Sequence, residues 1–144
     1  MQVFLDANVF LYAAGSDAGR AAPCLRILRA VEAGHIEATT STEVVQEVLH
    51  VVARRLGGVA AERAAAAVLD LVPAPLAVDV AVMRAAMELL RNQPQLGVRD
   101  AVHAAAMAQI RCTQIVSADR HFDLIAGLRR VDPLREDDVE AWLG

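Results

Sequence analysis

Four acidic residues carry the strongest chemical signal in this chain: Asp6, Glu47, Asp100 and Asp119. Each falls where a strand of an α/β protein would end or where a helix would begin. In open α/β sheets, the carboxyl ends of the strands border the crevice in which ligands bind. Carboxylates gathered in one crevice repel each other unless a cation lies between them. The pattern therefore predicts a divalent cation, and from there phosphate chemistry.

Each acid also has a simpler explanation. Asp6 follows the apolar run Val3-Phe4-Leu5 and could merely cap the next helix. Asp100 opens an apolar segment, where a carboxylate stabilises the positive end of a helix. Asp119 comes just after Val116-Ser117, at what reads as a strand tip turning into a loop. No single acid is specific, but a parallel sheet would bring all these places to one edge.

The segment 42–49 contains two glutamates one helical turn apart, Glu43 and Glu47. Glu47 borders the stripe formed by Val44 and Val48, so it is the better candidate, although either could be a solvated surface charge. His103 follows Asp100 by one turn. A histidine on an apolar helix is more often a hydrogen-bonded core residue than a catalytic group.

Three further polar residues are candidates for supporting roles. Asn8 could bind a phosphate oxygen or a metal-bound water, or could satisfy backbone donors in the first turn of a helix. Ser117 lies at the expected strand tip, two residues before Asp119. Asp123 could be a second, weaker ligand or a solvated loop charge.

Oxygen ligands favour Mg²⁺ or Mn²⁺, and no His and Cys cluster has the spacing that would select zinc. Two such ions could clamp the attacking and leaving oxygens of a phosphoryl displacement. All 14 basic residues are arginine, and the absence of lysine counts against receiver domains and haloacid-dehalogenase phosphatases, whose chemistry uses one. The chain has neither a P-loop nor an esterase nucleophile elbow.

Length and composition limit the number of domains, the kind of core and the kinds of partner. A length of 144 residues suits a single domain, 1–144. Hydrophobic residues make up 56% and aromatics 3%, so the core must be aliphatic, and the apolar excess suggests an oligomer or a protein partner.

No apolar stretch approaches the length of a membrane span and no signal peptide is visible, so we expect a cytoplasmic protein. Cys24 and Cys112 read as reduced core thiols. The net charge of −4 argues weakly against nucleic-acid binding, but it becomes neutral once the four acids are set aside.

Short apolar runs alternate with helical patterns along the chain. This alternation predicts a three-layer α/β/α fold with a central parallel sheet of four to five short strands. Expected strands are 2–5, 36–39, 76–78, 114–117 and, at an edge, 128–131. Expected helices are 8–14, 19–33, 42–56 (capped by Thr42), 60–71, 79–90 and 100–111.

Four segments, in this order, resemble the PIN domain, and specifically the VapC-type ribonuclease toxins of bacterial toxin–antitoxin pairs. They are Phe4-Leu5-Asp6-Ala7-Asn8-Val9-Phe10-Leu11-Tyr12, Thr40-Ser41-Thr42-Glu43-Val44-Val45-Gln46-Glu47-Val48, Val98-Arg99-Asp100-Ala101-Val102-His103-Ala104 and Ile115-Val116-Ser117-Ala118-Asp119-Arg120-His121-Phe122-Asp123. The resemblance spans nearly the whole chain.

The resemblance implies Mg²⁺- or Mn²⁺-dependent endonucleolytic cleavage of RNA. It makes Asp6, Glu47, Asp100 and Asp119 the catalytic, metal-binding quartet, supported by Asn8, Ser117 and Asp123. It also implies a homodimer and a cognate antitoxin that covers the acidic groove. Two alternatives remain: a PIN-fold RNA- or protein-binding module that has lost catalysis, and a PIN nuclease of RNA processing outside toxin–antitoxin systems.

Overall fold

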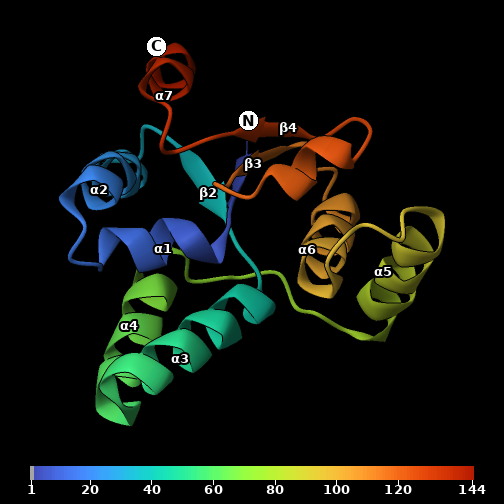
Figure 1. Cartoon of the computed structure of the whole chain (residues 1–144), viewed down its shortest axis with the longest axis horizontal. Coiled ribbons are helices and arrows are strands. Elements are labelled where there is room, and N and C mark those ends of the chain that lie inside the picture. Colours follow the sequence, from blue (N-terminus) through green and yellow to red (C-terminus); the bar gives the residue numbers. More distant parts are fainter. Residues whose placement is uncertain (1) are drawn as a thin grey trace.

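A four-stranded, wholly parallel sheet forms the centre of the protein in the computed structural model, which describes residues 2–144 (Figure 1). The strands, β1 (Gln2–Leu5), β2 (Glu37–Thr39), β3 (Gln114–Val116) and β4 (Arg129–Val131), lie in the order β2-β1-β3-β4. Helices cover both faces, which confirms the predicted α/β/α architecture. Phe4 pairs with Thr39 on one side and Ile115 on the other. The chain leaves β1 toward β2 and returns to β3 on the opposite side, so a topological switch point falls between β1 and β3.

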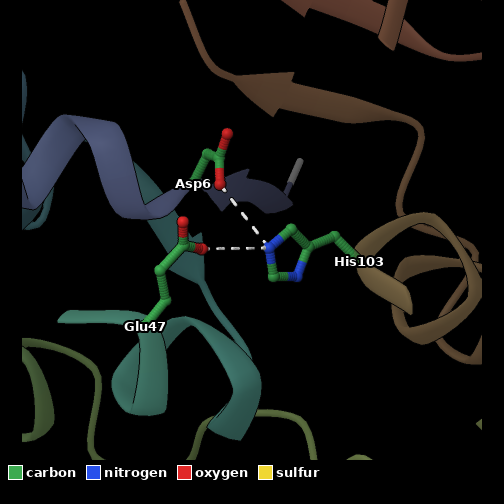
Figure 2. Close-up of side chains that lie close together, drawn as sticks. All are labelled: Asp6, Glu47 and His103. Atoms are coloured by element: carbon green, nitrogen blue, oxygen red, sulfur yellow. Dashed lines mark ion pairs between the residues drawn. The ribbon is translucent and has the colours of Figure 1, made fainter. Parts of the chain in front are cut away.

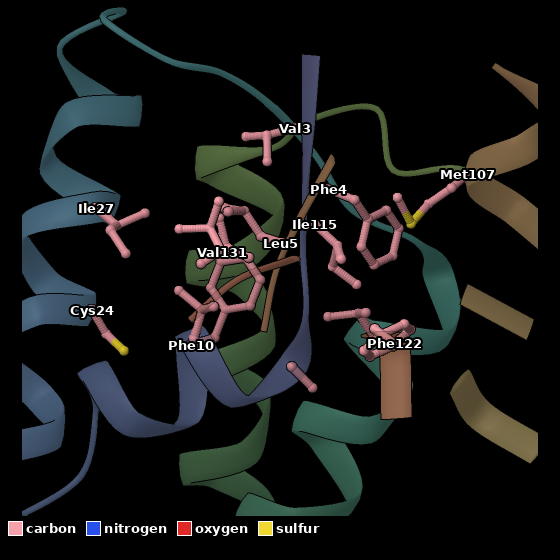
Figure 3. Close-up of a cluster of buried hydrophobic side chains, with 14 of the residues drawn as sticks. Val3, Phe4, Leu5, Phe10, Cys24, Ile27, Met107, Ile115, Phe122 and Val131 are labelled. Carbon is pink, nitrogen blue, oxygen red and sulfur yellow. The ribbon is translucent and has the colours of Figure 1, made fainter. Parts of the chain in front are cut away.

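The alternation of side chains along β1 divides the core between the two faces of the sheet. Val3 and Leu5 point toward α2 (Ala18–Glu32), while Phe4 points toward Met107 on α6 (Val98–Gln109) (Figure 3). All three β1 side chains are buried. With so few aromatics, the other buried positions are mostly Val, Ile and Ala, as expected from the composition.

The remaining helices form pairs around this core. Between β1 and α2 lies α1 (Ala7–Ala13), and α3 (Thr42–Leu56) packs antiparallel to α4 (Gly58–Leu71). The next pair is α5 (Val80–Asn92) with α6. After β3 come a short 3₁₀ helix, η1 (Arg120–Leu124), and, beyond β4, α7 (Glu136–Leu143). None of the described helices has the length and apolarity needed to cross a bilayer.

Helix ends follow the capping residues in the sequence. Asp17 accepts from Gly19 N at the start of α2, and Asp79 accepts from Val82 N at the start of α5. The cap of α3 was predicted one residue too late, because Ser41 rather than Thr42 accepts from Val44 N. Gly57 separates α3 from α4 with a φ of 90°, a left-handed backbone that favours glycine.

The expected strand at 76–78 is wrong. Leu76 makes a single parallel bridge to Ser41, outside the sheet. Leu76 N donates to Thr40 O and Leu76 O accepts from Thr42 N, after which the partner chain turns into α3. A ladder cannot continue along a partner that has become helical, so the apolar run at 76–78 packs without joining a sheet.

The two cysteines, Cys24 and Cys112, are buried and free, as expected for core thiols. Burial, reinforced by the charge of Asp132, raises the pKa of Cys24 to about 11. The thiol form therefore persists at neutral pH, which fits a packing role.

Candidate metal centre

Asp6 lies directly beyond β1, at the switch point, and its carboxylate is buried. Its backbone N–H donates to Val116 O at 3.1 Å, which extends the pairing of β1 with β3 to the strand tip. Oδ1 accepts from Ala7 N at 2.7 Å, so Asp6 also caps α1. Asp6 therefore caps α1, as one interpretation expected, and the same side chain also lies in a cluster of potential metal ligands.

Ser117 and Asn8 fix the other oxygen of Asp6. Ser117 Oγ donates to Asp6 Oδ2 at 2.6 Å, and Asn8 Nδ2 donates to the same atom at 3.0 Å. Asn8 Oδ1 accepts from Ala118 N at 3.2 Å, so the amide ties the start of α1 to the loop after β3. Asn8 thus contacts the backbone of the distant strand end, and this contact was not among the roles foreseen for it. Ser117 Oγ also accepts from Asp119 N at 3.0 Å, which orients the next acid.

Glu47 extends from the second turn of α3 toward the same point. Its Oε2 lies 3.8 Å from His103 Nε2, and its Oε1 accepts from Arg99 Nη1 at 3.3 Å. Glu43, one turn earlier, reaches only the flank of this group, 4.0 Å from Arg99 Nε. The geometry therefore favours Glu47 over Glu43 as the member of the cluster.

His103 completes a first cluster with Asp6 and Glu47 (Figure 2). One potential ligand atom from each residue lies within 4.8 Å of the other two. The His103 side chain is only 1% exposed and its ring packs against Phe4, with centroids 5.6 Å apart. Burial was expected, but hydrogen-bond satisfaction was not found: neither ring nitrogen has a partner within residues 2–144.

A second cluster unites Asp100, in the first turn of α6, with Asp119 and His121. Asp119 Oδ1 lies 2.7 Å from His121 Nδ1 and accepts from His121 N at 2.9 Å. Gly97 precedes α6, and a Cβ there would come within 3.2 Å of Asp100 Oδ2. His121 was missed in the sequence, because its contact with Asp119 arises only from the turn of η1, in which it lies.

Electrostatics links the two clusters. Burial, together with the charges of Asp119 and Asp6, raises the pKa of Asp100 to about 6. Burial also raises the pKa of Asp6, against the opposing effects of His103 and the hydrogen bond from Ser117. By contrast, the contact with His103 lowers the pKa of Glu47 despite burial, and Arg99 adds to the effect. Two crowded carboxylates with raised pKa values are the arrangement that a cation would relieve.

Asp123 does not join either cluster formed by the described residues. Its two oxygens accept from Arg130 Nε and Nη2 at 2.9 and 3.0 Å, a bidentate pair that lowers the pKa of Asp123. Arg130 also donates to Ser117 O at 2.9 Å and lies 3.2 Å from Asp132. Arg130 therefore connects Asp123 to the backbone of Ser117, beside the clusters.

The donor set suits a divalent cation. Carboxylate oxygens from Asp6, Glu47, Asp100 and Asp119 match the preference of Mg²⁺ and Mn²⁺, and two imidazoles stand beside them. The orphaned nitrogen of His103 is a further sign that a group is to be held between these side chains. Acidic side chains gathered at the switch point of a parallel sheet could hold such a cation next to a phosphate group.

Comparisons with known proteins identify the family to which the chain belongs. The family model described as the PIN domain matches residues 3–128. Ribonuclease VapC7 of Mycobacterium tuberculosis is 34% identical over 137 residues, covering 91% of each chain. The chain therefore belongs to the PIN domain family, and its sequence relatives are VapC ribonucleases.

Solved structures share the fold at lower identity. The M. tuberculosis toxin VapC20, described as cleaving the sarcin–ricin loop, superposes with a TM-score of 0.71 at 21% identity, covering 88% of this chain and 98% of that one. A structure of VapBC2 from Rickettsia felis, bound to a DNA fragment from their promoter, gives 0.69 at 17% identity, covering 90% and 97%. At such identities the likeness shows the PIN-like fold.

Proposed function

We propose that this chain is a metal-dependent endoribonuclease that hydrolyses RNA phosphodiester bonds, and that it is the toxin of a toxin–antitoxin pair. One observation carries the proposal: two clusters of carboxylate and imidazole groups meet at the switch point of the sheet. Membership of the PIN family and the VapC relatives support it. In this proposal residues 1–144 act as one nuclease domain.

The proposed roles follow from the contacts. Asp6, Glu47, Asp100 and Asp119 would hold Mg²⁺ or Mn²⁺. The bound cation would lower the pKa of the attacking water and offset charge on the phosphoryl oxygens.

The surrounding side chains would position these groups. Ser117 and Asn8 hold Asp6 in one orientation through hydrogen bonds of 2.6 and 3.0 Å to Oδ2. Arg99 is half exposed beside Glu47, where its guanidinium would contact a flanking phosphate of the RNA.

Cleavage of a single-stranded RNA by purified protein tests the activity. Asp100→Asn removes one carboxylate charge from the centre and should lower the cleavage rate on the order of a hundredfold or more, since even outer-shell changes at metal sites cost about 10–100-fold. Glu62→Gln, an exposed change on α4, is the matched control and should cleave at the wild-type rate. If Asp100→Asn matched the wild type, or EDTA had no effect, the nuclease assignment would be wrong. Binding of RNA without cleavage would favour the inactive module.

The proposed antitoxin has a suitable surface. An apolar groove runs between the first four helices, lined by Phe10, Leu11, Leu25, Leu28, Val52 and Leu71 among others. It continues toward Leu56, whose side chain is 75% exposed. We propose that an apolar segment of the antitoxin fills this groove. The VapBC and FitAB complexes among the structural neighbours support an antitoxin partner, and the apolar lining of the groove supports its place. An exposed apolar surface of this kind is a common mark of a protein partner.

Induced expression in bacteria tests the biological role. The wild-type chain should arrest growth, whereas Asp100→Asn should not. Co-expression of a small protein encoded beside this gene should restore growth, and Leu25→Glu in the groove should weaken that rescue. Normal growth with an actively cleaving wild-type protein would instead favour an RNA-processing nuclease.

A second apolar surface lies on α5. Val80, Met83 and Met87 are exposed at helical spacing, and Val98 at the start of α6 is 63% exposed. We propose that Val80, Met83 and Met87, which we call the α5 stripe, form a homodimer interface with Val98 as a further contact, because this surface is separate from the groove and the three α5 residues share one helix face.

A further inference from the structure

His103 is the least satisfied polar side chain of the site. It comes from the buried face of α6, is 1% exposed, and has no hydrogen bond at either ring nitrogen within the described chain. A buried polar group without a partner loses its hydration without compensation and destabilises the fold. Aliphatic residues occupy the neighbouring positions, so packing alone does not explain a histidine here.

The ring is aimed at one point. Figure 2 shows Nε2 facing both Asp6 and Glu47, at 3.7 Å from Asp6 Oδ1 and 3.8 Å from Glu47 Oε2. Both distances exceed the range of a hydrogen bond. Two ligands that each lie about 2.0–2.2 Å from a shared cation stand roughly 3–4 Å apart, depending on coordination angle. The separations are therefore those of atoms arranged around a common ion.

The three side chains come from independent elements, which makes the convergence a property of the fold. Asp6 follows β1, Glu47 lies on α3 and His103 on α6. Phe4 packs against the imidazole and restricts its position. His121, in the second cluster, differs because it is exposed and already contacts Asp119 at 2.7 Å, so it gives no comparable signal.

We propose that His103 Nε2 is a direct metal ligand, together with Asp6 and Glu47, and that this mixed nitrogen and oxygen site selects Mn²⁺ over Mg²⁺. The proposal deepens the proposed function and rests on its metal centre. Imidazole nitrogen suits transition metals, whereas Mg²⁺ prefers all-oxygen sites. The alternative role for the ring is an imidazolium that neutralises the two acids without touching the metal.

Electron spin-echo spectroscopy of Mn²⁺ bound to the full-length protein tests this directly. A coordinated imidazole gives ¹⁴N modulation, which should change to the ¹⁵N pattern when only the histidines carry ¹⁵N. This comparison needs no substitution, so it does not depend on whether a variant folds. Absence of histidine modulation in the wild type would overturn the proposal, and the imidazolium alternative predicts that absence.

Variants then assign the signal. His103→Leu should abolish the modulation and weaken Mn²⁺ binding, measured by calorimetry, by about tenfold or more, while Mg²⁺ affinity changes less than about threefold. The controls are His121→Gln, in the second cluster, and His50→Gln, exposed on α3, and both should keep the signal. Modulation that survives in His103→Leu, or equal loss of Mg²⁺ and Mn²⁺ affinity, would count against the assignment.

The outcomes separate this inference from the nuclease proposal. Histidine coordination without any RNA cleavage would remove the nuclease and leave the ligand assignment standing. RNA cleavage without histidine coordination would support the nuclease and overturn the assignment of His103 as a ligand.

Discussion

Ser117 Oγ donates to Asp6 Oδ2 at 2.6 Å, and this hydrogen bond joins the tips of β3 and β1 across 111 residues of sequence. The same hydroxyl oxygen accepts from Asp119 N at 3.0 Å. One side chain thus sets the orientation of an acid in each of the two clusters. Changes at Ser117 should therefore affect both stability and metal binding.

Ser117→Ala leaves the buried Asp6 carboxylate with one donor fewer and Asp119 N without its acceptor. We expect the free energy of unfolding to fall by about 1–3 kcal/mol, measured by urea denaturation. Mn²⁺ affinity should fall about tenfold, the lower end of the effect of outer-shell changes. Ser16→Ala, in the exposed turn after α1, is the control and should change neither quantity. An unchanged Mn²⁺ affinity in Ser117→Ala would show that Asp6 keeps its position without the hydroxyl.

Asp100 should make the metal-free protein less stable at neutral pH. Its pKa is about 6 in the folded protein, raised by burial and by Asp119 and Asp6, against an ordinary value of 3.8. The folded state therefore binds the proton more tightly than the unfolded state, and stability falls as pH rises from about 4 to 6. Asp100→Asn should be more stable than the wild type by roughly 1–3 kcal/mol at pH 7, and the difference should vanish below pH 4.

Urea denaturation of both proteins in EDTA, across pH 3.5–7.5, measures this difference. Saturating Mn²⁺ should reverse its sign at pH 7, because only the wild type keeps the full ligand set. Asp6→Asn should not share the benefit, since an amide at Oδ2 would face donors from Ser117 and Asn8. A constant difference between wild type and Asp100→Asn at all pH values would refute the raised pKa.

Among the residues near the protein surface, Arg130 should lower the free energy of unfolding the most when it is replaced by alanine. Its guanidinium is only 10% exposed and contacts Asp123, Asp132 and Ser117 O. Arg130→Ala leaves the buried Asp132 without its cation, so we expect a loss of about 2–4 kcal/mol in unfolding free energy. Arg129→Ala, the exposed neighbour on β4, should cost under about 0.5 kcal/mol. Thermal and urea unfolding would measure both losses. Equal losses for the two variants would contradict a stabilising role for the contacts of Arg130 with Asp123, Asp132 and Ser117 O.

The α5 stripe should determine the oligomeric state. A double change, Met83→Glu with Met87→Glu, places two charges in the proposed apolar interface and should yield a monomer by light scattering. The wild type should have twice that mass. Val59→Glu alters an equally exposed apolar residue on α4 and should leave the dimer intact. If Val59→Glu gave the monomer instead, the contact between copies would lie at the groove end of the molecule.

The sequence predicted well those features that local rules determine. Asp6 and Asp119 were found from apolar runs that end in an acid, and the structure places both at strand tips of a parallel sheet. The edge position of β4 was also foreseen. The choice of Glu47 over Glu43 rested on the stripe of Val44 and Val48. The fold adds a second reason that the sequence does not contain, because Arg99 and His103 come from α6, more than fifty residues away.

Other features depended on contacts that local patterns do not encode. The run at 76–78 has strand composition but lies beside the start of α3, where pairing ends after one bridge. Asp123 was interpreted as either a weaker ligand or a solvated loop charge, but it forms a bidentate pair with Arg130 on β4. His103 was expected to be a satisfied core histidine. Periodicity predicted that it is buried, and only the positions of Asp6 and Glu47 show where its nitrogen points.

The place of β3 in the sheet has a consequence for synthesis of the protein. This strand comes late in the chain but lies beside β1, and it brings Ser117 and Asp119 to an acid made more than a hundred residues earlier. A nascent chain that has not yet emerged past β3 lacks Asp119 and His121, two of the six clustered side chains, and also Ser117, which orients Asp6. Under the proposed function, an unfinished polypeptide on the ribosome would therefore not yet have a complete metal centre.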